Sequence, residues 1–390
     1  MSTTRSRIAR RVEALPPSGI RRFFDLVERM PEAISLGIGE PDFVTPWRIR
    51  ESAIYSLERG HTHYTANRGL QELRTELARY LARRFGVEYD PAEELLVTVG
   101  ASEAIDVALR AVLEPGDRVL VPQPCFVSYV PCVELAGGSA VPVPTSVRNG
   151  FQVQIEDLAA AARQGARALL LGYPNNPTGA TLPRDQVERV VRFAQERDIL
   201  ILSDEIYAEL TYDGGHVSMA AVPAGRERTI LIGGFSKAWA MTGWRLGFAA
   251  GPPDLIAAMA KVHSYTVMCS PTTAQEAAVD ALRACEEDIA EMRRQYNQRR
   301  RVIVSRLNQM GLECFEPKGA FYAFPAIGST GMTAEEFAER LLAEEQVAVI
   351  PGTAFGACGE GFVRCSYATS MPLLEEALRR MASFAARARG

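Results

Sequence analysis

Six apolar runs of strand length, most of them separated by helical patterns, limit the folds open to this chain more than any other feature. The runs are Leu95–Val99, Val119–Val121, Ala168–Leu171, Ile199–Leu202, Thr229–Ile232 and Leu246–Ala250. The clearest helical patterns between them are Glu103–Leu113, Val127–Leu135 and Arg184–Arg197. Strands that are apolar along their whole length are buried on both faces, so the pattern predicts an α/β fold with a mostly parallel sheet between two layers of helices.

From about Pro271 the pattern changes to long helices and short strands. The expected helices are Thr272–Cys285, Ile289–Met310, Ala334–Leu342 and Leu373–Ala386, and the expected strands lie near Phe321–Phe324, Val347–Ile350 and Phe362–Cys365. A chain of 390 residues suits about two domains. We expect a large domain over residues 46–285 and a smaller α+β domain that combines residues 1–45 with 286–390.

Composition excludes several classes of function. A net charge of −4 argues against a general nucleic-acid surface, and no apolar run approaches the roughly 20 residues of a membrane span. The seven cysteines include no CxxC pair, so we expect no metal site and no disulfide framework, and a cytoplasmic location. The Arg-rich N-terminus is read as a surface arm, with an organellar presequence as the alternative.

Lysine is scarce, and one lysine stands in an unusual context. The chain has three lysines, Lys237, Lys261 and Lys318, so 40 of its 43 basic residues are arginine. Lys261 and Lys318 have polar or turn-like neighbours, whereas Lys237 lies in the nearly uncharged stretch GGFSKAWAMTGWRLGF. Partial desolvation lowers the pKa of an amine and frees its lone pair to attack a carbonyl, which arginine cannot do. Lys237 is therefore predicted to be a covalent catalyst.

Polar motifs follow the predicted strands where an α/β sheet binds ligands, beyond the carboxyl ends of its strands. Gly100-Ala101-Ser102-Glu103 opens a helix, which favours a phosphate site or a plain N-cap. Asp204 and Tyr207 follow Ile199–Leu202 in SDEIY; the acid either caps the next element or meets a cationic ring. Asn176, in YPNNPTG, lies in a turn by composition. Gly37-Ile38-Gly39-Glu40-Pro41-Asp42 begins like a dinucleotide fingerprint, but Asp42 takes the place of the third glycine and no strong strand precedes it, which argues against a nucleotide site of that kind.

Together these residues resemble the class I/II aminotransferases, the pyridoxal-phosphate enzymes of fold type I in the aspartate aminotransferase superfamily. The resemblance covers essentially the whole chain, from GEPDF at Gly39 to VRCSYATS around Arg364. SKAWAMTGWRLGF is a highly specific motif, and YPNNPTG and SDEIY precede it in the family's order. The resemblance implies a large domain built as an α/β/α sandwich, a smaller α+β domain, and pyridoxal 5′-phosphate as cofactor.

The resemblance also implies a role for each residue around the cofactor ring. Lys237 would hold the cofactor as a Schiff base and then move the substrate proton. Asp204 would keep the pyridine nitrogen protonated. Tyr207 and Asn176 would hydrogen-bond the phenolic oxygen. Phe126 would stack on the ring, with core packing as the alternative reading.

Phosphate and substrate contacts are implied in the same way. Arg245, Ser236, Ser102 and the N–H of Ala101 would bind the phosphate. Tyr64 matches a tyrosine that reaches the phosphate from a partner subunit, so the resemblance implies a homodimer with shared active sites. Arg364 would bind the substrate α-carboxylate with a bidentate fork, assisted by Asn176 and the backbone at Gly39, with an ordinary surface arginine as the alternative.

The chain departs from some relatives at two positions. Gly234 stands where certain members have a phosphate-binding serine. Ser102 stands where some aspartate-using relatives have a lysine for the side-chain carboxylate, which puts acidic substrates in doubt unless Arg21 or Arg22 replaces it. The segment that carries these arginines resembles the mobile arm of relatives, or an amphipathic surface helix.

The predicted activity is transfer of an amino group from an L-amino acid to a 2-oxoacid by a ping-pong cycle, with 2-oxoglutarate as the shared acceptor. The donor stays open among aspartate, aromatic amino acids, alanine and N-acylated diaminopimelate. Two alternatives are a C–S β-lyase on the same scaffold and a non-enzymatic sensor, although the segment before Gly39 is too short for an added DNA-binding module.

Overall fold

The centre of the molecule is a seven-stranded sheet. The computed structural model describes residues 7–16, 30 and 32–389. The strands lie in the order β2-β8-β7-β6-β5-β3-β4. They are β2 (Leu95–Thr98), β3 (Arg118–Gln123), β4 (Ser139–Pro144), β5 (Ala168–Gly172), β6 (Leu200–Asp204), β7 (Thr229–Gly234) and β8 (Gly247–Ala250). All adjacent pairs are parallel except those of β8, which is antiparallel to both β2 and β7.

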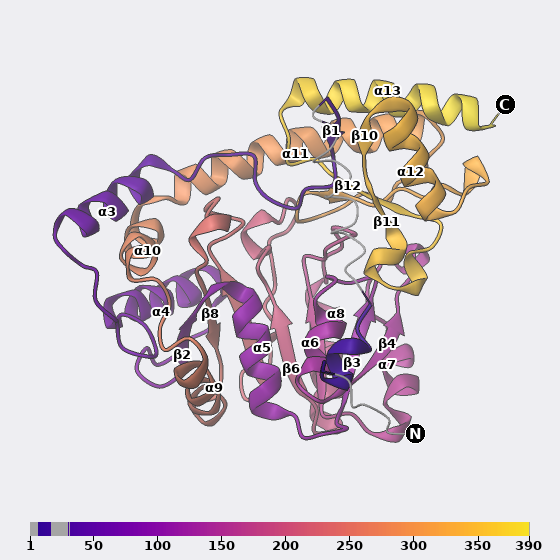
Figure 1. Cartoon of the computed structure of the whole chain (residues 1–390). Helices are drawn as coiled ribbons and strands as arrows, with labels where there is room; N and C mark the ends of the chain where they lie inside the picture. Colours follow the sequence, from indigo (N-terminus) through magenta and orange to yellow (C-terminus); the bar gives the residue numbers. More distant parts are fainter. Residues whose placement is uncertain (1–6, 17–29, 31, 390) are drawn as a thin grey trace.

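Helices cover both faces of this sheet, as expected for an α/β/α sandwich (Figure 1). The helices of this part of the chain are α3 (Trp47–Glu58), α4 (Gln71–Phe85), α5 (Gly100–Val112), α6 (Tyr129–Leu135), α7 (Ile155–Ala161), α8 (Arg184–Glu196), α9 (Pro253–Thr266) and α10 (Thr272–Ala284). Of these, α3 packs mainly on α10 and lies to the side of the sheet. Successive residues of β5 point to opposite layers. Leu170 packs in the cluster that includes α5, α6 and α9, whereas Leu169 and Leu171 pack in the cluster that includes α7 and α8. The continuous apolar runs therefore bury one side chain after another on alternate faces.

Residues 286–389 form a second layer of helices and short strands above the carboxyl edge of the sheet (Figure 1). Its elements are α11 (Glu286–Gln309), β9 (Tyr322–Ala323), α12 (Ala334–Glu345), β10 (Val347–Ala348), β11 (Ile350–Pro351), β12 (Val363–Ser366) and α13 (Met371–Arg389). β9, β11 and β12 form an antiparallel sheet. The N-terminal strand β1 (Ile34–Ser35) pairs in parallel with β10, so residues before the large sheet join the C-terminal part. The domain boundaries at residues 46 and 286 stay a prediction.

The expected strands and helices are found within a few residues of their predicted bounds, and the sequence reading omitted some elements. β4 was not recognised because its sequence, SAVPVP, contains two prolines and is largely exposed. Such a strand is tolerated at a sheet edge, where β4 lies. Arg21 and Arg22 lie outside the described residues, so their predicted role is a matter for experiment.

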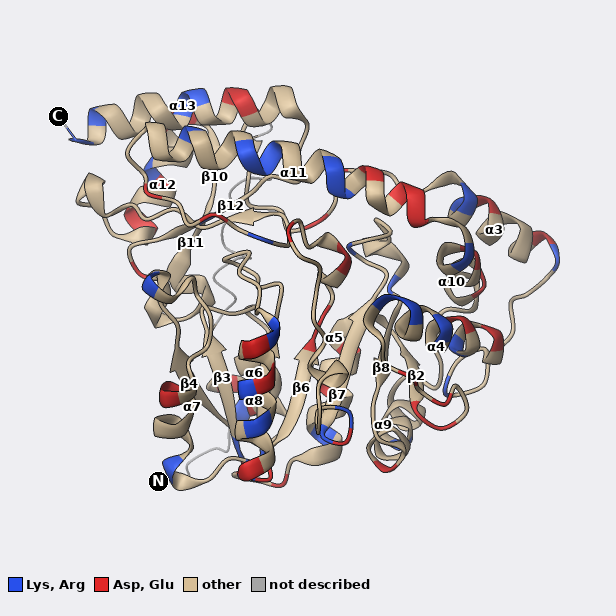
Figure 2. Cartoon of the chain, turned by 180° about the vertical axis from the view of Figure 1, so that it is seen from behind, with Lys and Arg blue, Asp and Glu red and all other residues tan. Residues whose placement is uncertain are grey.

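Surface charge is mixed on the face seen from behind. Figure 2 shows basic residues interleaved with acidic ones along α4, α8 and α11. Within the described part of the chain, no helix combines the length and apolarity that crossing a bilayer requires.

Candidate active site

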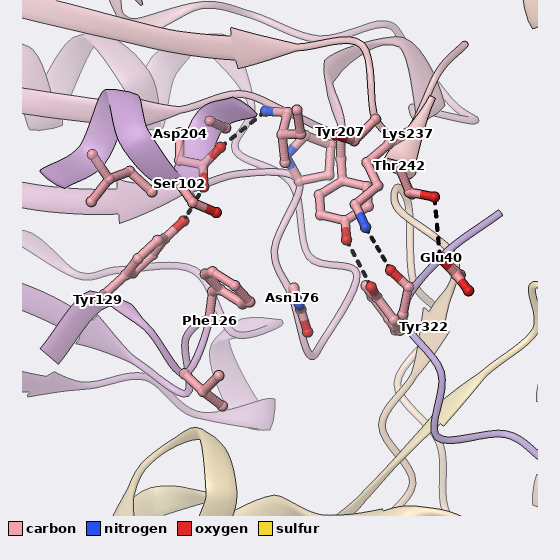
Figure 3. A pocket seen from close by; sticks show the side chains of 18 of the residues that line it. Glu40, Ser102, Phe126, Tyr129, Asn176, Asp204, Tyr207, Lys237, Thr242 and Tyr322 are labelled. Carbon is pink, nitrogen blue, oxygen red and sulfur yellow. Dashed lines mark hydrogen bonds between the residues drawn. The ribbon is translucent and has the colours of Figure 1, made fainter. Parts of the chain in front are cut away.

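A cavity of about 950 Å³ lies at the carboxyl edge of the large sheet. It is large enough for a cofactor together with a small substrate. Eleven of the twelve predicted site residues line it. These are Gly39, Ala101, Ser102, Phe126, Asn176, Asp204, Tyr207, Ser236, Lys237, Arg245 and Arg364. They come from strands, loops and a helix start that are far apart in the sequence, and the fold brings them together at the edge of the sheet (Figure 3).

The Lys237 amine faces this cavity just after the end of β7. Its Nζ donates a hydrogen bond to the carbonyl oxygen of Gly39 at 2.5 Å. Burial lowers the pKa of Lys237 to about 8, and the positive charge of Arg364 adds to the effect, while Glu40 and Asp204 oppose it. A substantial fraction of the amine is therefore neutral near pH 8, which is the form that attacks carbonyl groups.

Asp204 is the last residue of β6 and is buried. The Tyr129 hydroxyl donates to its Oδ2 at 2.7 Å, and the Ile206 N–H donates to its Oδ1 at 3.2 Å (Figure 3). Burial raises the pKa of Asp204 to about 6, although both hydrogen bonds pull it down. No ion pair to a basic side chain compensates this carboxylate within the described residues. The site thus has a buried anion that suits a cationic partner.

Arg364, on β12, is a buried cation in the same site as the buried anion Asp204. Its Nη1 donates to Oδ1 of Asn176 at 2.9 Å and its Nη2 donates to the carbonyl oxygen of Gly37 at 2.6 Å. Its Nε has no hydrogen-bond partner among the described residues, and burial lowers the pKa of the guanidinium. A buried guanidinium that donates hydrogen bonds only to neutral oxygens and has a free N–H among the described residues suits an added carboxylate.

Tyr207 and Phe126 stand on the loops that follow β6 and β3. The Tyr207 hydroxyl lies 2.7 Å from the hydroxyl of Tyr322, and burial raises the pKa of Tyr207. Phe126 is half-buried and meets Tyr129 edge to face, with ring centroids 5.7 Å apart. Phe126 lines the cavity and also packs on Tyr129, so its position fits both a ring-stacking and a packing role.

The N-terminus of α5 forms one wall of the cavity. Ala101 and Ser102 lie in its first turn, where backbone N–H groups lack partners within the helix. Arg245, which precedes the antiparallel strand β8, reaches the same edge. Its guanidinium lies so close to Gly100 that a Cβ there would be 2.9 Å from Nη2. A helix N-terminus beside an arginine and Ser102 is suited to a phosphate.

Packing accounts for the glycine at position 234. A Cβ at Gly234 would lie 3.2 Å from the backbone of both Leu246 and Gly247, and 2.9 Å from a methyl of Ile206. A side chain there would force neighbouring backbone apart. Ser236 lines the cavity nearby instead.

Residues 36–45 form a strap that runs past the cavity from β1 to α3. The carbonyl oxygens of Gly37 and Gly39 accept hydrogen bonds from Arg364 and Lys237. Asp42 binds Arg299 of α11 at 2.7 Å. The segment that resembled a dinucleotide fingerprint is thus a strap between the two layers of the molecule.

Tyr64 is the one predicted site residue that the chain does not bring to the cavity. It lies between α3 and α4, and its side chain is 80% exposed. Its predicted role requires a second subunit, and the structure is of one chain.

The sequence reading missed four polar residues that line the cavity: Glu40, Tyr129, Thr242 and Tyr322. Tyr129 lies three residues after Phe126, and Tyr322 lies in the aromatic run GAFYAF, so both read as core residues. Their hydroxyls matter only through Asp204 and Tyr207, contacts across 75 and 115 residues that no local pattern reveals.

Comparison with known proteins identifies the family of the chain. Residues 31–381 match the family described as Aminotransferase class I and II. The chain is 47% identical to an aspartate aminotransferase of Pyrococcus abyssi over 374 residues, which is 95% of this chain and 96% of the relative. It is 46% identical, with the same coverage, to the aromatic-amino-acid aminotransferase 2 of Thermococcus litoralis.

A solved structure shows the same architecture. The aspartate aminotransferase of Thermus thermophilus, determined with maleate, superimposes with a TM-score of 0.93 at 39% identity, covering 97% of this chain and all of the other. With matches over nearly its full length, the chain belongs to the class I and II aminotransferase family and is an aminotransferase of that fold.

Proposed function

We propose that this aminotransferase uses pyridoxal 5′-phosphate to move an amino group from an L-amino acid to a 2-oxoacid in a ping-pong cycle. 2-Oxoglutarate is proposed as the shared acceptor and glutamate as its product. The relatives carry names for aspartate and for aromatic amino acids, so the donor is proposed from that group, with alanine and N-acylated diaminopimelate as further candidates.

The observation that carries the proposal is a set of unmatched charges around one reactive amine. Asp204 is a buried anion without an ion-pair partner among the described residues, and Arg364 is a buried cation whose hydrogen bonds there go only to neutral oxygens. The pKa of Lys237 responds to both of them. A phosphorylated pyridine aldehyde and an amino-acid carboxylate would together supply the missing charges, so the residues present fit this cofactor.

Pyridoxal phosphate, when bound, supplies an aldehyde that condenses with amines and a ring that draws electrons from the substrate's Cα–H bond. Lys237 would hold it covalently and then, through Nζ, remove and return the substrate proton. The carboxylate of Asp204 would keep a ring nitrogen protonated, held in place by Tyr129. Tyr207 and the Asn176 amide would donate hydrogen bonds to the ring oxygen.

The remaining residues would bind the two anionic ends. The Ala101 N–H, Ser102, Ser236 and Arg245 would hold the phosphate at the start of α5. Arg364 would bind the α-carboxylate of the substrate, and the strap at Gly39 would cover the cavity next to it. Phe126 would stack on the ring and exclude water from it.

A homodimer is proposed to complete the site. Asn67 joins the Tyr64 loop to the end of α9 through hydrogen bonds to Ser264 and to the carbonyl oxygen of Met268. Large apolar side chains are exposed on α3 and its adjoining loops, and at the end of α9 and in the loop that follows it. They are Val44, Trp47, Ile54, Tyr55, Leu57, Tyr64, Tyr265, Val267 and Met268. A surface with this many exposed apolar side chains is suited to a second copy, whose Tyr64 would reach the phosphate. A cytoplasmic location is kept as a prediction.

The experiment is a donor screen with 2-oxoglutarate in which glutamate formation is followed across acidic, aromatic, aliphatic and diamino acids. The proposal predicts glutamate formation with at least one class of donor and the matching oxoacid as co-product. Release of ammonia and pyruvate from cysteine conjugates, with no oxoacid added and no glutamate formed from any donor, would instead support the C–S lyase.

A further inference from the structure

We propose that Tyr322 is a positioning residue that links cofactor binding to substrate binding, acting on Tyr207 through its hydroxyl and on Arg364 through its ring. The inference rests on the proposed function and assigns a role within the same site to a residue outside the sequence motifs. Figure 3 shows Tyr322 next to Tyr207 and close to Lys237.

The proposed cofactor determines which of the two tyrosines, Tyr322 or Tyr207, donates the hydrogen bond between their hydroxyls. The hydroxyls of Tyr322 and Tyr207 are 2.7 Å apart, and both side chains are buried. In the described part of the chain neither hydroxyl has another hydrogen-bond partner. If Tyr207 donates its proton to an oxygen in the cavity, its own oxygen must accept, so Tyr322 must be the donor to Tyr207. Donation by Tyr322 polarises Tyr207 and strengthens the hydrogen bond that Tyr207 makes.

The aromatic ring of Tyr322 contacts Arg364, the residue proposed to bind the substrate. The guanidinium of Arg364 lies 4.5 Å from the ring centroid of Tyr322 and 4.9 Å from that of Phe355. Two aromatic rings thus fix the plane of the Arg364 guanidinium, the group that would bind a carboxylate. A cation–π contact at a desolvated site contributes to holding that orientation.

The strap is shaped to admit Tyr322. A Cβ at Gly39 would lie 2.7 Å from the Tyr322 hydroxyl oxygen, too close for any other residue without displacing the hydroxyl. The backbone of Gly39 also accepts the hydrogen bond of Lys237. Tyr322 therefore touches three parts of the site at once, from the small sheet that contains β9.

The test compares the wild type with Tyr322→Phe, which keeps the ring, and Tyr322→Leu, which removes it. Tyr367→Phe is the matched control: its hydroxyl is buried beside β12, away from the cavity, and the Ala320 carbonyl oxygen it contacts also accepts from Tyr212. Each protein is loaded with pyridoxal phosphate, and its near-visible absorbance is titrated with pH. Affinity is measured with α-methyl-L-glutamate, which has no α-proton to lose.

Tyr322→Phe should raise the midpoint of the absorbance titration by about half a pH unit, because a weaker hydrogen bond from Tyr207 leaves more negative charge in the cofactor's ring system. Its affinity for α-methyl-L-glutamate should change less than about twofold. Tyr322→Leu should show the same rise and bind α-methyl-L-glutamate about tenfold more weakly. Tyr367→Phe should match the wild type in both measurements.

Gly39→Ala tests the Tyr322–Tyr207 hydrogen bond in a second way, because its methyl group would displace the Tyr322 hydroxyl. It should raise the midpoint of the absorbance titration as Tyr322→Phe does. An unchanged midpoint in Tyr322→Phe and in Gly39→Ala would overturn the role of the hydroxyl, and unchanged affinity in Tyr322→Leu would overturn that of the ring. Failure of the wild type to bind pyridoxal phosphate would contradict the proposed function itself.

Discussion

At the scale of single residues, the site consists of charges that the folded chain leaves without partners. Asp204 and Arg364 are buried and Lys237 is half-buried, each at a cost that the chain alone does not recover. The proposed function accounts for that cost, because the cofactor and substrate would supply the opposite charges. Two predictions follow from these residues.

Replacing Lys237 with alanine should leave pyridoxal phosphate bound through its phosphate, yet reduce transamination at least about a thousandfold, since both the covalent link and the proton carrier are lost. Lys261→Ala, at an exposed position on α9, is the control and should keep full turnover. Rates of glutamate formation measure both variants. Wild-type turnover in Lys237→Ala would refute the assigned mechanism.

Asp204→Asn should stabilise the cofactor-free protein near neutral pH while impairing catalysis. Burial raises the pKa of Asp204 from 3.8 to about 6, so the folded state holds the proton more tightly than the unfolded chain. Stability is therefore present below about pH 4 and lost as the pH rises through about 6, at a cost of about 3 kcal/mol. Asparagine removes that cost but loses one hydrogen-bond acceptor, which offsets about 1 kcal/mol.

Urea unfolding of the cofactor-free proteins measures the effect. Asp204→Asn should be about 2 kcal/mol more stable than the wild type at pH 7, and this advantage should be lost and then reversed, by up to about 1 kcal/mol, as the pH falls to about 4 and below. A variant that is less stable at pH 7 would show that the carboxylate is satisfied in the absence of cofactor.

At the scale of elements, the sequence predicts what depends on local pattern. The buried strands were recognisable because each is apolar on both faces, and Asp204 and Asn176 were recognisable because they lie at the end of such a strand or in the turn after it. β4 was missed because its two prolines suppress the strand pattern at an edge. Tyr322 was missed because its role depends on a contact with Tyr207 across 115 residues. Tyr64 was assigned from the resemblance alone.

The junction between β8 and α5 gives a prediction at this scale. A Cβ at Gly247 would lie 2.5 Å from the backbone nitrogen of Ala101 and equally close to the carbonyl carbon of Gly100. Gly247→Ala must therefore displace the N-terminus of α5, where the phosphate is proposed to bind. We expect about tenfold weaker binding of pyridoxal phosphate and a loss of about 2 kcal/mol in the free energy of unfolding.

Gly328→Ala is the control, because a Cβ at Gly328 meets nothing within 4 Å. A fluorescence titration of each cofactor-free protein with pyridoxal phosphate gives the dissociation constants. If Gly247→Ala binds the cofactor as tightly as the wild type, the start of α5 is not the phosphate site.

At the scale of the whole molecule, the single chain leaves large apolar side chains exposed to solvent, which is not expected of an enzyme that works as a monomer. Trp47 is 56% exposed, Val44 72% and Tyr64 80%, all near α3. The proposed homodimer would bury this surface and bring a partner's Tyr64 to each cavity. The cavity of one chain would then be only part of the working site.

Light scattering should give a mass about twice the 42.7 kDa of one chain. Trp47→Glu should place a charge in the interface, shift the population to monomers and weaken cofactor binding about tenfold. Leu373→Glu, on α13 and 48% exposed, lies outside the proposed interface and should stay dimeric. A wild-type monomer with full activity would contradict the shared site.

The central claim is that a single amine, Lys237, carries the cofactor, and borohydride reduction tests it most directly. The purified protein is saturated with pyridoxal phosphate, reduced, digested and analysed by mass spectrometry. The account predicts one stable phosphopyridoxyl group on the peptide that contains Lys237 and none on Lys261 or Lys318. A protein that stays colourless and unlabelled, or that carries the label on a different residue, would contradict it.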